Sequence, residues 1–269
     1  MKADPTQRFS SRVESYVSYR PRYPVEVLKT LQTECRLTSA SVVADVGSGT
    51  GFLSELFIDN GNQVLAIEPN LEMRVAGEKY LSNKPEFESI DGSAENTTLP
   101  GRSVDFVVAG QAFHWFDRSQ AKCEFMRILK PMGWVMLVWN DRDTESTPFL
   151  AAYEQLLREY STDYEQINHK QIDKTVLSAF FGAAPLHEKR FSYSQTFDYE
   201  GLKGRMLSSS YVPEAGHQNH EEMIARLWKI FQTYCGGDRV VFKYATRMFY
   251  SQIAPTASGS NSILPDEHE

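Results

Sequence analysis

Between residues 41 and 140, short apolar runs alternate with segments whose apolar residues recur at helical spacing. This pattern is typical of βαβ units and predicts a parallel sheet. Two runs, VDFVVAG (104–110) and GWVMLVWN (133–140), are almost wholly apolar, as expected for central strands covered on both faces. The expected strands are 41–46, 63–68, 86–91, 104–110 and 133–140, and the expected helices are 52–61, 71–81 and 118–130.

The pattern becomes less regular after residue 148. PFLAAYEQLLREY (148–160) and EEMIARLWKIFQTYC (221–235) have the periodicity of amphipathic helices. In contrast, 186–199 and 239–250 alternate between apolar and polar residues as half-buried strands do. We therefore expect these two late strands to complete the sheet that the first half of the chain begins.

This organisation predicts one α/β domain over residues 1–252 with its core at 41–140. The segments at about 141–185 and 200–236 are then a helical cap or insertions. The remaining residues, 253–269, are rich in Ser, Pro and acidic residues, a composition that predicts a disordered tail.

Composition and charge narrow the classes of partner. The chain has 28 Lys and Arg against 35 Asp and Glu, a net charge of −7, and no block of five like charges. Nucleic acid and anionic membranes are therefore disfavoured as partners, and a small-molecule partner is favoured. Cys35, Cys123 and Cys235 lie far apart, which predicts neither a disulfide framework nor a metal site and favours a cytoplasmic protein. The polar N-terminus predicts no signal peptide, and no uncharged stretch approaches the ~18 residues of a membrane span.

A glycine-rich loop follows the first predicted strand. The run VVADV leads directly into Gly47-Ser48-Gly49-Thr50-Gly51 and then into a helix, at the carboxyl end of a strand, where open α/β sheets bind ligands. Glycines let the backbone approach a ligand closely, and the helix N-terminus offers free N–H donors, so we expect a nucleotide or nucleoside cofactor. A dinucleotide G-x-G-x-x-G fingerprint would need glycine at position 52, which is Phe52.

The spacing of Asp45, Gly47, Gly49 and Gly51 resembles the first motif, D-x-G-x-G-x-G, of the class I S-adenosylmethionine-dependent methyltransferases. Glu68, 23 positions after Asp45, is similar to the family's acceptor for the ribose hydroxyls. The segment DGSAENTTLP (91–100) resembles the segment that binds the cofactor's adenine in this family. The strand at 104–110, the helix at 118–130 and the L-K-P-x-G turn before the strand at 133–140 resemble the strand-helix-strand unit that comes later in the family's chain. The resemblance covers residues 42–139.

The resemblance implies a doubly wound, mostly parallel, seven-stranded Rossmann-like sheet with a helical cap, and S-adenosylmethionine as the cofactor. It also implies direct in-line methyl transfer to the acceptor. The cofactor-binding residues that it implies are Asp45, Gly47, Ser48, Gly49, Gly51, Glu68, Pro69, Ser93, Ala94, Glu95 and Gln111.

A second resemblance concerns the acceptor. The segment QAFHWF and the leading Tyr16-x-x-Tyr19-Arg20-Pro21-x-Tyr23-Pro24 look like the branch of small-molecule methyltransferases that includes the trans-aconitate carboxyl methyltransferases. It leads us to expect a carboxylate acceptor, with Arg20 and Arg22 as an anion clamp. His114 is the candidate catalytic residue, either as a general base or as a substrate-binding group. The expected substrate-binding residues are Tyr16, Tyr19, Arg20, His114 and Trp115.

Two alternatives stay open at this point. A non-catalytic cofactor-binding or regulatory protein would keep the glycine loop without needing an acceptor pocket. A nicotinamide-dependent oxidoreductase is disfavoured by Phe52. The N-P-P-Y type motif that holds planar amines in some relatives is replaced by GQAF (110–113), which disfavours acceptors held in that way. Neither the oligomeric state nor the acceptor's identity follows from the sequence.

Overall fold

The computed structural model describes residues 17–162, 164 and 174–253. At its centre lies a seven-stranded sheet in the order β3-β2-β1-β4-β5-β7-β6. Neighbours among the first five strands pair in parallel, and β7 runs antiparallel to both β5 and β6. The predicted doubly wound, mostly parallel sheet is therefore confirmed. The strands are β1 (Val42–Val46), β2 (Gln63–Ile67), β3 (Phe87–Ile90), β4 (Val104–Gly110), β5 (Leu129–Arg142), β6 (His187–Phe197) and β7 (Val240–Ser251).

Helices cover both faces of the sheet. On one face, Leu31 and Phe57 pack with the strands in one apolar cluster. On the other face, Phe125 and Phe181 belong to a second cluster that includes Val107. The helices are α2 (Val25–Glu34), α3 (Phe52–Ile58), α4 (Leu71–Tyr80), α5 (Arg118–Ile128), α6 (Pro148–Tyr160), α7 (Lys174–Phe181), α8 (Tyr199–Leu207) and α9 (His220–Tyr234), with the short 3-10 helix η3 (Phe113–Trp115) before α5.

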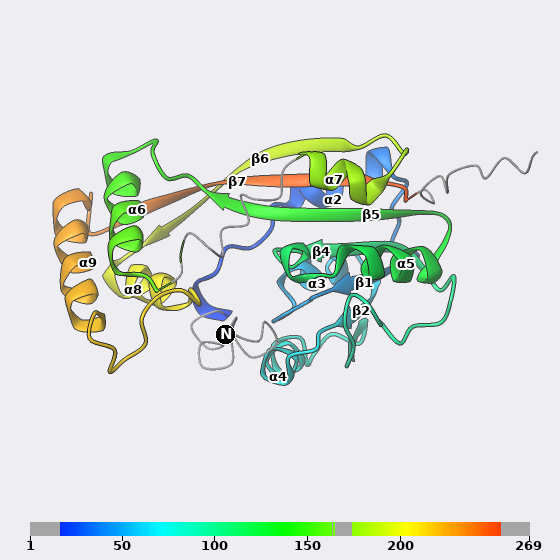
Figure 1. Cartoon of the computed structure of the whole chain (residues 1–269), viewed down its shortest axis with the longest axis horizontal. Coiled ribbons are helices and arrows are strands. Elements are labelled where there is room, and N and C mark those ends of the chain that lie inside the picture. The colour runs from blue at the N-terminus through cyan, green and yellow to red at the C-terminus, as the bar shows by residue number, and fades with distance from the viewer. Residues whose placement is uncertain (1–16, 163, 165–173, 254–269) are drawn as a thin grey trace, which may run out of the picture.

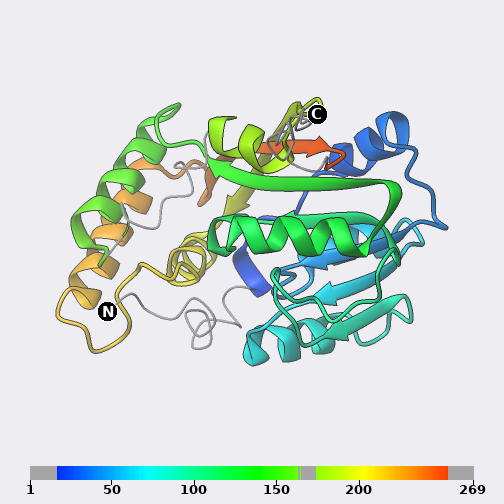
Figure 2. The same cartoon turned by 45° about the vertical axis from the view of Figure 1, so that its right-hand side comes forward.

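The helical cap is built on the long strands β6 and β7. These strands run from the main sheet to the group formed by α6, α8 and α9 (Figures 1 and 2). In β7, Phe242 is buried in a third apolar cluster with Tyr153 and Leu227, whereas Met248 is buried against the main sheet. Because one continuous strand contributes to both cores, the cap is attached to the sheet by packing and by backbone pairing.

Two elements differ from the sequence prediction. Helix α7 lies within the segment expected to form a cap or insertion, but Leu177 and Phe180 pack on the main sheet beside Phe113. Strand β5 begins at Leu129, directly after α5, rather than after the Gly133 turn. The pairing of β5 with β4 is irregular between Val104 and Phe106, and this irregularity absorbs the L-K-P-x-G segment into the strand. Asp117 is the N-cap residue of α5 and accepts hydrogen bonds from the backbone N–H groups of Ser119 and Gln120.

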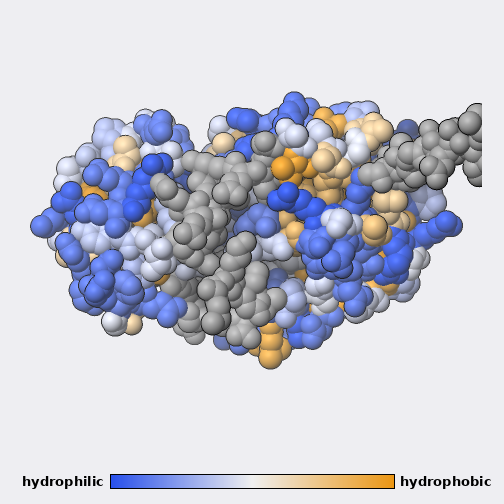
Figure 3. All heavy atoms as spheres, in the orientation of Figure 1, coloured by the Kyte–Doolittle hydropathy of each residue, from blue (hydrophilic) through white to orange (hydrophobic). Residues whose placement is uncertain are grey.

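Polar residues cover most of the visible face of the cap end (Figure 3). The large apolar side chains that are exposed come from several elements rather than from one. They are Val25, Leu71, Val75, Met126, Met132, Trp228, Tyr234 and Val241. Within the described residues, no helix combines the length and the apolarity needed to cross a membrane.

Candidate active site

A cavity of about 370 Å³ lies where the carboxyl ends of β1, β2, β4 and β5 meet the cap. This is the edge at which open α/β sheets bind ligands, because the loops diverge there. One half is lined by the glycine loop and its neighbours, and the other half by residues of the cap. The residues predicted from the sequence that line it are Arg20, Asp45, Gly47, Ser48, Gly49, Glu68, Pro69, Ser93, Ala94, Glu95, Gln111, His114 and Trp115.

The glycine loop is held against the end of the neighbouring strand. The backbone N–H groups of Gly47 and Ser48 both donate to the Ile67 carbonyl, at 2.8 and 3.1 Å. Gly47 has φ of +70°, and a Cβ added there would lie 2.5 Å from the Cβ of Ala112. Any other residue at position 47 would clash with Ala112 and would have to adopt a positive φ, which residues other than glycine disfavour. The backbone of Gly47 is therefore exposed to the cavity without a side chain in between.

Two buried carboxyl groups lie beside this loop. Asp45 is fully buried; its Oδ2 accepts a hydrogen bond from Ser54 Oγ at 2.7 Å, and its Oδ1 has no hydrogen-bond partner among the described residues. Burial raises the pKa of Asp45 to about 7, against the lowering effect of Ser54. Glu68 accepts hydrogen bonds from the backbone N–H of Gly49 and of Asn70, both at 2.9 Å, while burial raises its pKa.

These groups fit the cofactor that the motifs imply. A buried carboxyl oxygen without a partner and a second carboxylate with spare lone pairs suit a ligand that carries positive charge and a vicinal diol. Thr50 adds a buried hydroxyl without a partner in the described structure, and it also lines the cavity. Glu68 would hold the ribose of the cofactor. Asp45 and Thr50 lie at the glycine loop, which would hold the part of the cofactor beyond the ribose.

The predicted adenine segment forms a closed turn at the same end of the cavity. Ser93 and Asn96 exchange backbone hydrogen bonds of 3.0 and 3.2 Å, and Ala94 is buried between them. The Glu95 carboxylate accepts a hydrogen bond of 2.8 Å from the backbone N–H of Asp117. Glu95 therefore connects this turn to the start of α5, directly after the helix η3 that carries His114.

A hydrogen-bonded network lies at the ends of the central strands. Gln111 follows β4 with φ of +60°, a conformation uncommon outside glycine, and its side-chain amide donates to the Asn140 carbonyl at 3.3 Å. The Asn140 side chain accepts from Thr246 Oγ1 at 2.6 Å and donates to the Arg22 carbonyl at 3.1 Å. The network thus joins β4, β5, β7 and the N-terminal segment beneath the cavity.

Arg205 is the most unusual residue of the cap half. Its side chain is buried on α8, with Nε donating to the Tyr244 hydroxyl at 3.2 Å and Nη1 to Ser209 Oγ at 3.3 Å. Among the described residues, no Asp or Glu forms an ion pair with it. Arg20 lies nearby, because its Nη2 donates to the Ser208 carbonyl at 2.8 Å and to the same Ser209 hydroxyl at 3.4 Å. The guanidinium groups of Arg20 and Arg205, which both line the cavity, thus share one neutral acceptor, the Ser209 hydroxyl.

A third arginine of the cap half has its own counter-ion. Arg142 Nη2 donates to Glu154 Oε2 at 2.5 Å and to the Tyr164 hydroxyl at 3.0 Å, while Tyr164 donates to the same carboxylate at 2.7 Å. Glu154 also pairs with Arg158 at 3.1 Å. The negative charge of Glu154 is therefore already shared by two cations, and the surroundings of Arg205 remain positive.

His114 and Trp115 occupy η3, between β4 and α5. Both line the cavity, and their rings lie side by side with centroids 4.7 Å apart. The position of His114 in the cavity wall fits either role that the sequence suggests, as a base or as a binding group.

Three predicted positions lie away from the cavity or outside the described residues. The ring of Tyr19 packs on α8 so closely that a Cβ at Gly204 would lie 2.1 Å from it, and Tyr19 does not line the cavity. Gly51 is the N-cap residue of α3 and is likewise not part of the lining. Tyr16 lies outside the described residues.

The expectation that Arg22 forms part of an anion clamp is wrong. Its Nη1 donates to Glu55 Oε2 at 2.8 Å and to the Tyr80 hydroxyl at 2.6 Å. Its guanidinium also lies over the Phe52 ring, 3.8 Å from the centroid. Arg22 therefore fastens the N-terminal segment to α3 and α4, and its charge is already neutralised.

The sequence analysis missed the cap residues of the cavity. A signal for Arg205 was present, because Leu202 and Met206 place it on the apolar stripe of α8 at helical spacing. A charged residue on such a stripe is rarely buried without a purpose. The residues that line the cap half of the cavity and that the sequence analysis did not predict are Asn140, Arg142, Thr144, Tyr164, Arg205, Ser210 and Tyr211.

Known proteins with similar sequences are methyltransferases. Residues 44–137 match the family model described as a methyltransferase domain. An uncharacterized methyltransferase of Schizosaccharomyces pombe is 29% identical over 251 residues, which cover 92% of this chain and 97% of that protein. An uncharacterized methyltransferase of Mycobacterium bovis is 37% identical over 142 residues, 53% of this chain and 56% of its own.

Solved structures share the fold. A structure named as a type II methyltransferase of Anaeromyxobacter dehalogenans has a TM-score of 0.67 at 20% identity, covering 88% of this chain and 99% of that one. The YcgJ protein of Bacillus subtilis has a TM-score of 0.53 at 18% identity, covering 86% and 99%. The domain match, the relatives and the fold together set aside the oxidoreductase and non-catalytic alternatives. Together, the methyltransferase domain, the relatives named as methyltransferases and the shared fold support a class I S-adenosylmethionine-dependent methyltransferase.

Proposed function

We propose that the enzyme methylates a small carboxylic acid and forms its methyl ester. The observation that carries this proposal is Arg205, a buried guanidinium in the cavity wall without a carboxylate partner among the described residues. An arginine cannot lose its proton in a protein, and a buried unpaired charge is costly. An anionic acceptor would supply the missing negative charge, and a carboxylate matches the fork of guanidinium donors.

The walls of the cap half favour a short, polar acceptor. Its side chains are tyrosines, hydroxyls and arginines, including Tyr164, Ser210 and Tyr211. The aliphatic and thioether side chains of the lining, Leu53 and Met73, belong to the other half. The cofactor and the acceptor must share the cavity of about 370 Å³, so the part of the acceptor that enters it is small.

The residues of the chain act by binding and orientation. When bound, S-adenosylmethionine would supply a sulfonium-activated methyl carbon: the carboxylate oxygen would bond to this carbon as the S–CH3 bond breaks, and the electron pair would leave on sulfur as neutral S-adenosylhomocysteine. Arg205 and Arg20 would hold the acceptor carboxylate, and Trp115 would limit access of water. A carboxylate is ionised at neutral pH and needs no general base, so orientation is the main contribution of the protein.

A labelled-product assay tests the proposal. The enzyme is incubated with deuteromethyl S-adenosylmethionine and a panel of short mono- and polycarboxylic acids, with the matching primary amides as controls. We expect labelled products from acids only, and release of labelled methanol from them on mild alkaline hydrolysis. Label that resists hydrolysis, or that appears equally on the matching amides, would refute ester formation.

The role of His114 is tested by His114→Gln. If the acceptor is a carboxylate, the substitution mainly raises the KM for the acceptor and leaves kcat within a few-fold, because no proton has to be removed. A fall in kcat of about 10²-fold, with loss of an inflection near about pH 6–7, would instead identify His114 as a general base. Steady-state kinetics over a pH series distinguishes these results.

A further inference from the structure

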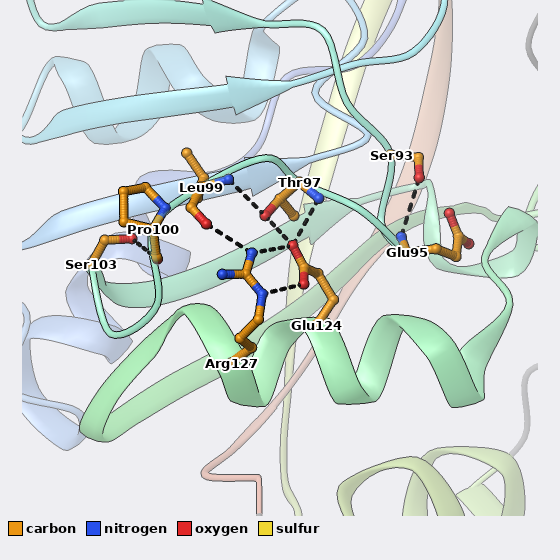
Figure 4. Close-up of polar contacts among 8 residues, drawn as sticks. All are labelled: Ser93, Glu95, Thr97, Leu99, Pro100, Ser103, Glu124 and Arg127. Atoms are coloured by element: carbon orange, nitrogen blue, oxygen red, sulfur yellow. Dashed lines mark hydrogen bonds and ion pairs between the residues drawn. The ribbon is translucent and has the colours of Figure 1, made fainter.

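The loop that carries the adenine segment is fastened to α5 by one buried carboxylate. Glu124 Oε1 accepts hydrogen bonds from the backbone N–H of Thr97 at 2.8 Å and from its hydroxyl at 2.5 Å (Figure 4). Thr97 is fully buried, and its hydroxyl also accepts a hydrogen bond of 3.3 Å from the Leu99 N–H. Glu124 therefore fixes the position of the loop relative to α5 at Thr97.

Arg127 completes this attachment from the next turn of α5. Its Nε and Nη2 each lie 2.7 Å from a different oxygen of Glu124, and Nη2 also donates to the Leu99 carbonyl at 2.7 Å (Figure 4). The Arg127 guanidinium, together with the Thr97 hydrogen bonds, lowers the pKa of Glu124 to about 2. The carboxylate is therefore charged at neutral pH.

The loop needs an external attachment of this kind. Thr98 has φ of +63°, in the left-handed region that residues with a β-branched side chain avoid. The hydrogen bonds between Ser93 and Asn96 fix the shape of the turn, and the bond from the Asp117 N–H to Glu95 holds one side of it, while Thr97 and Leu99 hold the other side to α5. Strain at Thr98 is maintained only while the groups on both sides, Thr97 and Leu99, are held in place.

We propose that Glu124 is a positioning residue of the cofactor site, which holds the loop so that Ser93–Glu95 meet the edge of the cofactor's adenine. Ser93, Ala94 and Glu95 line the cavity, whereas Glu124 does not. Its effect passes through Thr97, two residues beyond Glu95. The proposal requires the cofactor but not the carboxylic-acid acceptor.

The test measures recognition of the adenine edge in the full-length enzyme. Calorimetry gives the Kd of S-adenosylhomocysteine and of S-inosylhomocysteine, which has a 6-oxo group in place of the 6-amino group. The wild-type enzyme is expected to prefer the adenine compound by about tenfold or more, because a loop that hydrogen-bonds the 6-amino group would leave a buried group unpaired against the 6-oxo form. Glu124→Gln and Thr97→Val should each reduce that preference at least threefold and weaken S-adenosylhomocysteine binding about tenfold.

Two matched variants separate positioning from general stability. Thr97→Ser keeps the hydroxyl and should restore the preference. Asp105→Asn removes a comparable structural carboxylate, which binds the Val42 N–H and Lys130 Nζ at 2.8 Å each and does not line the cavity. It should lower the melting temperature without changing the preference.

The proposal is overturned by any of three results. One is an unchanged preference in both Glu124→Gln and Thr97→Val, even if both ligands bind more weakly. Another is an equal loss of preference in Asp105→Asn. The third is a wild-type enzyme that binds the adenine and hypoxanthine compounds equally. Because no acceptor is used, failure here is distinguishable from failure of the ester-forming reaction.

Discussion

Replacing Arg205 with methionine is expected to raise the KM for the acceptor at least 30-fold while leaving the Kd of S-adenosylhomocysteine unchanged. Truncating one partner of a buried, hydrogen-bonded charge pair costs about 2–5 kcal/mol, which corresponds to roughly 30-fold or more in affinity. Methionine keeps much of the length and apolar character of the side chain, so the packing beside Leu202 and Met206 is retained. Steady-state kinetics with a saturating cofactor concentration measures the change.

The same variant should not be less stable than the wild-type enzyme. Without an acceptor, Arg205 is a buried cation that lacks a carboxylate partner among the described residues, so its removal relieves a desolvation cost. Thermal unfolding should therefore show an equal or higher melting temperature. The matched control is Arg158→Met, which removes a positive charge from α6 outside the cavity lining and should leave the KM unchanged. A large loss of stability with a normal KM would show that Arg205 serves the fold and not the acceptor.

Replacing Glu68 with alanine is expected to weaken cofactor binding by about 1–3 kcal/mol, or roughly 5- to 150-fold. Two effects add here, because the ribose hydroxyls would lose a charged acceptor and the N–H groups of Gly49 and Asn70 would lose their partner. Glu68→Asp keeps the charge on a shorter side chain and should cost less. Calorimetric titration with S-adenosylhomocysteine gives the Kd of the wild-type enzyme and of the Glu68→Ala and Glu68→Asp variants.

A neighbouring carboxylate provides the control for Glu68. Glu72 lies in the first turn of α4 and is exposed, so Glu72→Ala removes the same charge close to the site without touching the cavity. Its cofactor Kd should stay within twofold of the wild-type value. If Glu68→Ala bound the cofactor as tightly as Glu72→Ala, Glu68 would have only a structural role in the glycine loop.

The sequence alone determined the core of the fold and its cofactor half. Alternating apolar runs and helical spacing predict the strands and helices between residues 42 and 142, because these patterns reflect burial on one or both faces of local elements. Glycine spacing and the Asp117 cap are equally local, since each depends on backbone conformation within a few residues. Asp45, Gly47 and Glu68 converge on one cavity because the carboxyl ends of adjacent parallel strands must lie at the same edge.

Only the tertiary structure decided which charges belong to the acceptor half. Arg20 and Arg22 look equivalent in the sequence, yet Arg22 meets Glu55 and is neutralised, whereas Arg20 meets Ser208 across 188 positions of the chain. Arg205 lines the cavity although it lies on α8, which follows the long strand β6 at the cap end of the molecule (Figure 1). Whether a charge has a counter-ion depends on partners that are distant in sequence and near in space. No local pattern contains that information, which is why the acceptor site that we propose could not be identified before the fold was known.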